Sequence, residues 1–87
     1  MTNRSFRARV TVRLGRGVND PQGNTVRDGL QALGHEDVRE VRVGKVIDLV
    51  LDAAAADEAR ARVEAMCHEL LANPVIETFE IELAGEP

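Results

Sequence analysis

Cys67 and His68 are the two residues whose types most suggest catalysis, because a thiol beside an imidazole can form a nucleophile with its base. They are consecutive within a segment whose apolar spacing predicts a helix. Side chains of consecutive helical residues point about 100° apart and cannot form a dyad. We therefore interpret Cys67 as a small core residue and His68 as a boundary residue. His35, which follows Gly34 in a loop, is expected to be exposed.

Phosphate-binding signatures are incomplete in this chain. A dinucleotide fingerprint needs its third glycine where Asp20 stands, and Gly44-Lys45 is followed by Val46 instead of the Ser or Thr of a P-loop. Asp20 also brings negative charge to a predicted helix start, and Pro21 removes an amide donor there. We predict that this chain alone binds no cofactor and no metal.

Asp48 is the remaining candidate for acid–base chemistry, because it interrupts the apolar run 46–51. In a small cofactor-free enzyme such a carboxylate would lie inside a cavity of the sheet. We expect Asp48 instead on the solvent or interface side of its strand.

Length, charge and composition exclude several classes of protein. With 87 residues the chain is predicted to be a single domain, 1–87, with its core within 6–83. Residues 1–43 carry eight Arg and five acids (+3), and residues 44–87 carry three Lys or Arg and ten acids (−7), giving −4 overall. This balance, with Phe6 and Phe79 as the only aromatic residues, argues against nucleic-acid binding. We found neither a signal peptide nor an apolar run long enough for a membrane span, so we expect a cytoplasmic protein without membrane contact.

The first half of the chain predicts a strand, a helix and another strand. Apolar residues alternate with polar ones over residues 6–14, as in a strand with one buried face. Asp20-Pro21 suits the start of a helix, and Gly34 suits its end. Gly23 and Gly29 inside this helix cost about 1 kcal/mol each relative to Ala and suggest close approach of another backbone or chain. A strand follows at residues 38–43.

The second half repeats this order. A strand at 46–51 is joined to the one before it by a tight hairpin at Gly44-Lys45. Asp57 suits an N-cap, and Asn73-Pro74 ends the second helix. The last strand covers residues 75–83, and apolar residues line one face of each helix: Val26, Leu30 and Leu33 in the first, and Ala59, Val63, Met66 and Leu70 in the second.

The element order βαββαβ predicts an α+β ferredoxin-like sandwich, in which two helices cover one face of a four-stranded antiparallel sheet. In that topology the first and last strands are neighbours. This places Arg7, Arg9 and Arg13 opposite Glu80 and Glu82 on the uncovered face. The open face and edges predict a homodimer or a higher homo-oligomer.

The sequence resembles the PurS subunit of bacterial phosphoribosylformylglycinamidine synthase (FGAM synthase) over nearly all of residues 6–83. The residues that carry this resemblance are Val10-Thr11-Val12, Gly17-Val18, Asp20-Pro21-Gln22-Gly23, Leu30, Leu33-Gly34, Val41-Arg42-Val43-Gly44-Lys45, Cys67, Leu70-Leu71-Ala72-Asn73-Pro74-Val75-Ile76-Glu77 and Ile81.

The resemblance implies an accessory subunit in purine (IMP) biosynthesis that has no active site of its own. In that family a glutaminase subunit, PurQ, releases ammonia, and a synthetase subunit, PurL, uses it with ATP. PurS joins the two and supports ammonia transfer, so ATP, Mg and glutamine belong to the partners. By the same resemblance we predict that eight residues form or shape interfaces: Asp20, Pro21, Gln22, Gly23, Gly44, Lys45, Asn73 and Pro74. Each of them also has an ordinary role in capping or turn formation.

One alternative function is a regulatory module of ferredoxin-like fold that binds a small metabolite between two subunits. Such a module would need a polar pocket at the dimer seam, and a thermal-shift screen of ligands would reveal it.

Overall fold

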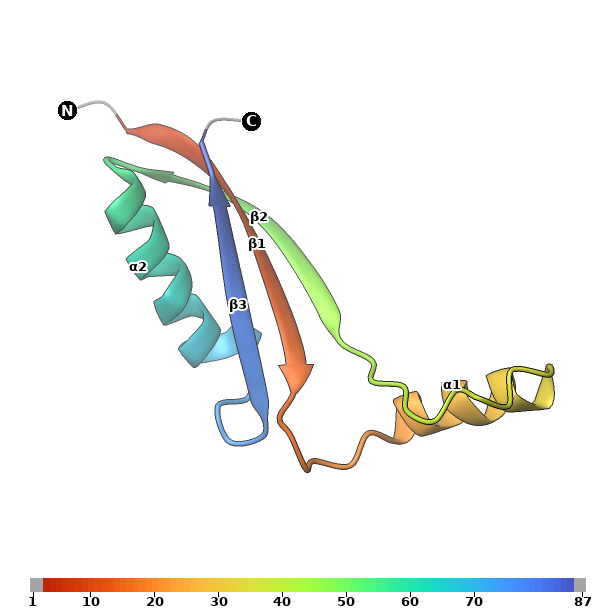
Figure 1. Cartoon of the computed structure of the whole chain (residues 1–87). Coiled ribbons are helices and arrows are strands. Elements are labelled where there is room, and N and C mark those ends of the chain that lie inside the picture. Colours follow the sequence, from red (N-terminus) through yellow and green to blue (C-terminus); the bar gives the residue numbers. More distant parts are fainter. Residues whose placement is uncertain (1–2, 86–87) are drawn as a thin grey trace.

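The computed structural model describes residues 3–85 (Figure 1). Its elements are β1 (Arg4–Leu14), α1 (Pro21–Ala32), β2 (Lys45–Ala53), α2 (Ala56–Met66), the π-helical turn η1 (Cys67–Leu71) and β3 (Glu77–Ala84). This is an α+β chain with two helices and, within the described residues, one sheet of three antiparallel strands.

β1 is the central strand, and both its neighbours run antiparallel to it in the order β2-β1-β3. Val10 lies opposite Ile47 on one side and Ile81 on the other. The alternation predicted from residue 6 onward is confirmed, because the even-numbered side chains of this strand are buried beneath α2: Phe6, Ala8, Val10 and Val12. Ala59, Val63 and Cys67 complete the core from the helical side.

The start and end of α1 agree with the sequence prediction. Asp20 is the N-cap residue, Pro21 is the first helical residue, and Gly34 takes the positive φ (108°) that follows the helix end. The N-cap predicted for α2 is wrong. α2 begins one residue before Asp57, and the carboxylate of Glu58 accepts a hydrogen bond from the amide of Ala54 (3.1 Å). The Glu58 carboxylate thus binds an amide that precedes the helix, and the N-cap residue Ala55 makes no side-chain hydrogen bond to the free amides of the first turn.

The C-terminal end of α2 widens into η1. Cys67 is fully buried at the start of this turn, and the ring of His68 contacts the ring of Phe79 edge to face with centroids 5.3 Å apart. η1 ends at Leu71, before Asn73-Pro74, as predicted. The expectation that Cys67 is a core residue is therefore confirmed.

Residues 38–43 were predicted as a strand that turns back at Gly44-Lys45, and this prediction is wrong. In the described chain they form no strand, and the backbone runs through Gly44 directly into β2 (Figure 1). The pattern of buried positions explains the difference. Val41 and Val43 on one side of Gly44, and Ile47 and Leu49 on the other, are all odd-numbered and partly buried. A two-residue hairpin would instead set an odd residue opposite an even one, for example 43 opposite 46.

The two helices do not share one face of the sheet, which corrects the predicted layering. α2 covers the sheet, whereas α1 stands away from it, and residues 38–43 run back beside α1 (Figure 1). We call residues 21–43 the arm. The molecule measures 58 × 27 × 14 Å, and its radius of gyration is 17.0 Å, whereas a compact domain of this length has about 12 Å. The arm therefore makes the chain elongated.

We expect Val63→Ala to lower the free energy of unfolding by about 2 kcal/mol, because Val63 is fully buried between α2 and the sheet and its loss leaves a cavity. Urea denaturation followed by circular dichroism measures this. Arg60→Ala, an exposed change on the same helix, should stay within about 0.5 kcal/mol of the parent. Equal effects of the two variants would contradict the assignment of Val63 to the core.

Candidate interaction site

The carboxylate of Asp20 connects the two segments by which the arm joins the sheet. It accepts a hydrogen bond from the amide of Gly23 (2.8 Å) in the first turn of α1 and another from the amide of Val43 (2.8 Å) just before β2. These two bonds, that from Gly23 first, hold the pKa of Asp20 below its ordinary value. Asp20 is buried, so its charge depends on these two donors.

Arg42 makes further hydrogen bonds in the same region. Its guanidinium donates hydrogen bonds to the carbonyl oxygens of Val18 (2.9 Å) and Gly15 (3.0 Å), which lie between β1 and α1. We call this region, residues 15–20 and 42–45, the junction. Arg42 belongs to the segment Val41-Arg42-Val43-Gly44-Lys45, but the sequence analysis did not select it as an interface residue. Its neighbours in the sequence do not indicate that its side chain binds backbone carbonyls.

Two glycines let backbones approach closely at the junction. A Cβ at Gly23 would collide with the carbonyl oxygen of Val41, and a Cβ at Gly44 would lie 2.7 Å from the carbonyl oxygen of Val12. Gly23 and Gly44 are therefore required by packing within this chain. For Gly23 the close approach predicted from the sequence is confirmed.

A hollow of about 440 Å³ opens beside the junction. It brings together five of the eight predicted interface residues, and Gly23 lies next to them through its bond to Asp20. Gln22 and Lys45 are exposed there, whereas Glu77 is an acidic lining residue that the prediction did not single out. The residues that line it are Val12, Leu14, Asp20, Pro21, Gln22, Val43, Gly44, Lys45 and Glu77.

Asn73 and Pro74 lie outside this hollow, in the exposed turn before β3. Asn73 stabilises the turn, because its amide donates to the side chain of Glu77 (2.6 Å) and its side-chain oxygen accepts from the amide of Val75 (3.0 Å). The carbonyl of Ile76 accepts from the amide of Gly15 (2.7 Å) and so ties the turn to the junction. The sequence motifs therefore gather at one end of the sheet.

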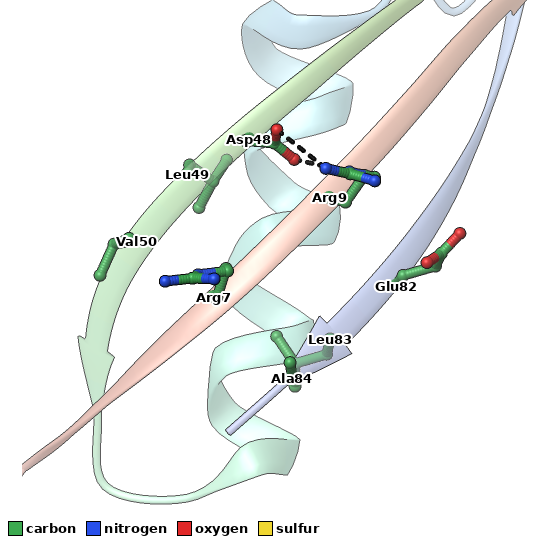
Figure 2. Close-up of a pocket in the computed structure, with 8 residues that line it drawn as sticks. All are labelled: Arg7, Arg9, Asp48, Leu49, Val50, Glu82, Leu83 and Ala84. Atoms are coloured by element: carbon green, nitrogen blue, oxygen red, sulfur yellow. Dashed lines mark hydrogen bonds and ion pairs between the residues drawn. The ribbon is translucent and has the colours of Figure 1, made fainter. Parts of the chain in front are cut away.

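The face of the sheet opposite α2 carries a second hollow of about 470 Å³ (Figure 2). There Arg9 pairs with Asp48 (2.8 Å), which lowers the pKa of Asp48 and raises that of Arg9 through their hydrogen bond. Asp48 thus lies on the solvent side of its strand, as expected. Of the arginines predicted to lie opposite Glu80 and Glu82, Arg9 lies opposite Glu82 but bonds to β2 instead. Arg13 lies opposite Thr78 and pairs diagonally with Glu80 (3.1 Å). Both pairs are exposed and contribute little to stability.

No group of three His, Cys, Asp or Glu residues within residues 3–85 could hold a metal ion. Burial raises the pKa of the Cys67 thiol, and His68 contacts Phe79. The same stretch contains no helix that is both long and apolar enough to cross a bilayer.

The chain matches a known protein family over most of its length. A family model described as "PurS: Phosphoribosylformylglycinamidine (FGAM) synthase" matches residues 7–85. The chain belongs to the PurS family. It is 38% identical over 78 residues to the FGAM synthase subunit PurS of Methanocaldococcus jannaschii, covering 90% of this chain and 94% of that one.

Solved structures agree with this assignment. The purS subunit of FGAM synthase from Thermotoga maritima is 31% identical, with a TM-score of 0.86 and 97% of both chains covered. A chain in the structure of PurLQS from the same organism is 32% identical, with a TM-score of 0.83, covering 92% of this chain and 98% of that one. High coverage in both directions means that the likeness includes the arm as well as the sheet.

Asp20→Ala should loosen the arm and leave the sheet intact, because it removes the cap of α1 and the acceptor for Val43. Losing these two hydrogen bonds costs about 2 kcal/mol, so amide protection in α1 should fall roughly 30-fold. Hydrogen exchange with mass spectrometry resolves α1 from β1. Asp28→Ala, on the exposed side of α1, serves as the matched control. Unchanged exchange in the Asp20 variant would show that the arm is held by other contacts.

Cys67 should react with a water-soluble disulfide reagent at least about 100-fold more slowly in the native protein than in urea, since its thiol is buried and its pKa is raised. A Cys67→Ala, Leu70→Cys variant provides an exposed thiol (Leu70 is 83% exposed) on the same turn and should react quickly. If Cys67 in the folded parent reacted as fast as the introduced thiol in the folded Leu70→Cys variant, the catalytic interpretation of Cys67 and His68 would have to be considered again.

Proposed function

We propose that this chain is a non-catalytic subunit of FGAM synthase and acts in the fourth step of purine nucleotide synthesis. In that step formylglycinamide ribonucleotide, glutamine and ATP give formylglycinamidine ribonucleotide. The observation that carries the proposal is the family match over residues 7–85.

The proposed role is to join the synthetase PurL to the glutaminase PurQ in the cytoplasm and to support ammonia transfer between them. The similar chain in the structure of PurLQS from Thermotoga maritima supports this assembly. ATP, Mg and glutamine would be bound by the partner subunits, and the ligase activity would be theirs.

We propose that the junction and the turn before β3 belong to the contact surface. Gln22, Lys45, Asn73 and Pro74 are exposed at this end of the sheet, where a partner can reach them. Asp20, Gly23 and Gly44 fix the backbone that presents those side chains. Their contribution is therefore to shape the surface.

Adding this protein to separately purified PurL and PurQ should restore glutamine-dependent synthesis and barely change the ammonia-dependent rate, because an adapter acts on delivery of ammonia. Product formation with each nitrogen source measures both rates, and size-exclusion chromatography reports the complex. Gln22→Ala with Lys45→Ala should weaken the glutamine-dependent rate, whereas Arg60→Ala on the outer side of α2 should not.

If neither rate responds and no complex elutes, the adapter role fails. The metabolite-binding module then becomes the leading function, and thermal-shift screening of small ligands would be the next measurement. An equal increase of both rates would also contradict the proposal, because it would indicate an effect on the synthetase itself.

A further inference from the structure

The side of the sheet that faces away from α2 has an uneven distribution of charge. We call this side the open face. Arg9 on β1 pairs there with Asp48 on β2 (2.8 Å), and Arg13 on β1 pairs with Glu80 on β3 (3.1 Å). Because each pair brings opposite charges together, these two arginines have little attraction left for a further anion.

Arg7 on the same strand is in a different environment. The sheet register sets it opposite Val50 of β2 and opposite Ala84 of β3, so its neighbour on each side is apolar. Within residues 3–85 its guanidinium forms no ion pair. In Figure 2 its side chain lies apart from both carboxylates that line the hollow. Arg7 therefore presents an exposed positive charge beside apolar side chains.

The open face also exposes large aliphatic side chains. Val46 is 57% exposed and Val50 is 60% exposed, although the solvent side of an antiparallel sheet is commonly polar. The two valines are four residues apart on β2, which corresponds to about 13 Å. An occupant that covers both of them and reaches Arg7 must be longer than a single carboxylate or phosphate group. A protein surface fits this face better than a small anion.

A second copy of this chain does not suit the open face. β1 is the central strand of the sheet, so two open faces stacked about a two-fold axis at β1 would set β1 over β1. Arg7, Arg9 and Arg13 of one copy would then lie against the arginines of the other, and like charges would repel each other. We therefore expect a different protein, one that presents a carboxylate.

The hollow on the open face is separate from the hollow beside the junction. Arg7 lines the first and Leu14 lines the second, and these residues are seven positions apart on β1, or about 23 Å. A subunit that joins two others needs two contact surfaces. The junction with the turn before β3 forms one end of the sheet and supplies one of them, so the open face can supply the other.

We propose that the open face is the docking surface for one of the two partner subunits, and that Arg7 receives a carboxylate which this partner presents among aliphatic side chains. Those aliphatic side chains cover Val46 and Val50 and exclude water from the ion pair, which strengthens it. The planar fork of an arginine can bind both oxygens of a carboxylate. This inference rests on the proposed function, because it names the surface that holds one of the partners.

The test titrates this protein into a fixed mixture of PurL and PurQ and measures the glutamine-dependent rate. The concentration that gives half of the maximal rate reports how tightly the protein is held. Arg7→Ala should raise this concentration at least about tenfold and leave the rate at saturation unchanged. Arg7→Lys, which keeps the charge without the fork, should raise it less. Val50→Asp, which gives Arg7 an acid within its own chain, should raise it as Arg7→Ala does.

Arg13→Ala is the matched control, because Arg13 lies on the same strand and the same face but already pairs with Glu80. It should change the half-maximal concentration less than about twofold. Circular dichroism verifies that each variant is folded. If Arg7→Ala had no larger effect than Arg13→Ala, the docking surface would be wrong and the adapter role would stand. If the parent protein restored no rate at all, the proposed function itself would fail.

Combining Arg7→Ala with the Gln22→Ala and Lys45→Ala changes tests whether the open face and the junction are separate surfaces. Their fold-changes should multiply, because distant sites act independently. A combined effect no larger than the stronger single effect would overturn the separate site.

Measurements on the free protein test the two other occupants of the open face. A change of mass by light scattering in the Arg7→Ala variant would assign the face to a second copy. A rise in Tm with inorganic phosphate that this variant lacks would assign the hollow to a small anion. Either result would overturn the proposal, and we expect neither.

Discussion

The hydrogen bonds of the Asp20 carboxylate hold the arm to the rest of the molecule. They join the start of α1 to the amide of a residue 23 positions later, so the two ends of the arm stay together although α1 stands away from the sheet. Arg42 adds a second fastening through the carbonyls of Val18 and Gly15. Both ends of the arm are thereby fastened by hydrogen bonds at the junction.

The sequence predicted most elements of this fold because their signals are local. Alternation located β1, Asp20-Pro21 and Gly34 bounded α1, and Asn73-Pro74 placed the end of the second helical segment. The prediction of a hairpin at Gly44-Lys45 was wrong. A two-residue turn there would have set odd-numbered residues of one strand opposite even-numbered residues of the next, so the buried positions would have had to change from odd to even. The odd-numbered apolar positions on both sides of Gly44 already indicated one continuous strand direction.

The candidate site was only partly visible in the sequence. One hollow is lined by five of the residues predicted to form interfaces: Asp20, Pro21, Gln22, Gly44 and Lys45. Arg42 was missed because it binds the carbonyls of Val18 and Gly15, which lie far away in the chain, and no spacing rule reveals such a contact. Glu77 was missed although the amide that it binds, that of Asn73, belongs to the same turn. Cys67, which has a reactive side chain, is buried in the core, and His68 contacts the ring of Phe79.

The exposed apolar residues Val26 and Leu33 affect how stable the unassembled protein is in a cell. A copy that has not found its partner presents Leu33 and the bare edge of β2 to solvent, and both are features that promote aggregation and proteolysis. We therefore expect unassembled chains to be degraded faster than assembled ones. Degradation of unassembled copies would keep the amount of this subunit matched to the amount that is built into complexes.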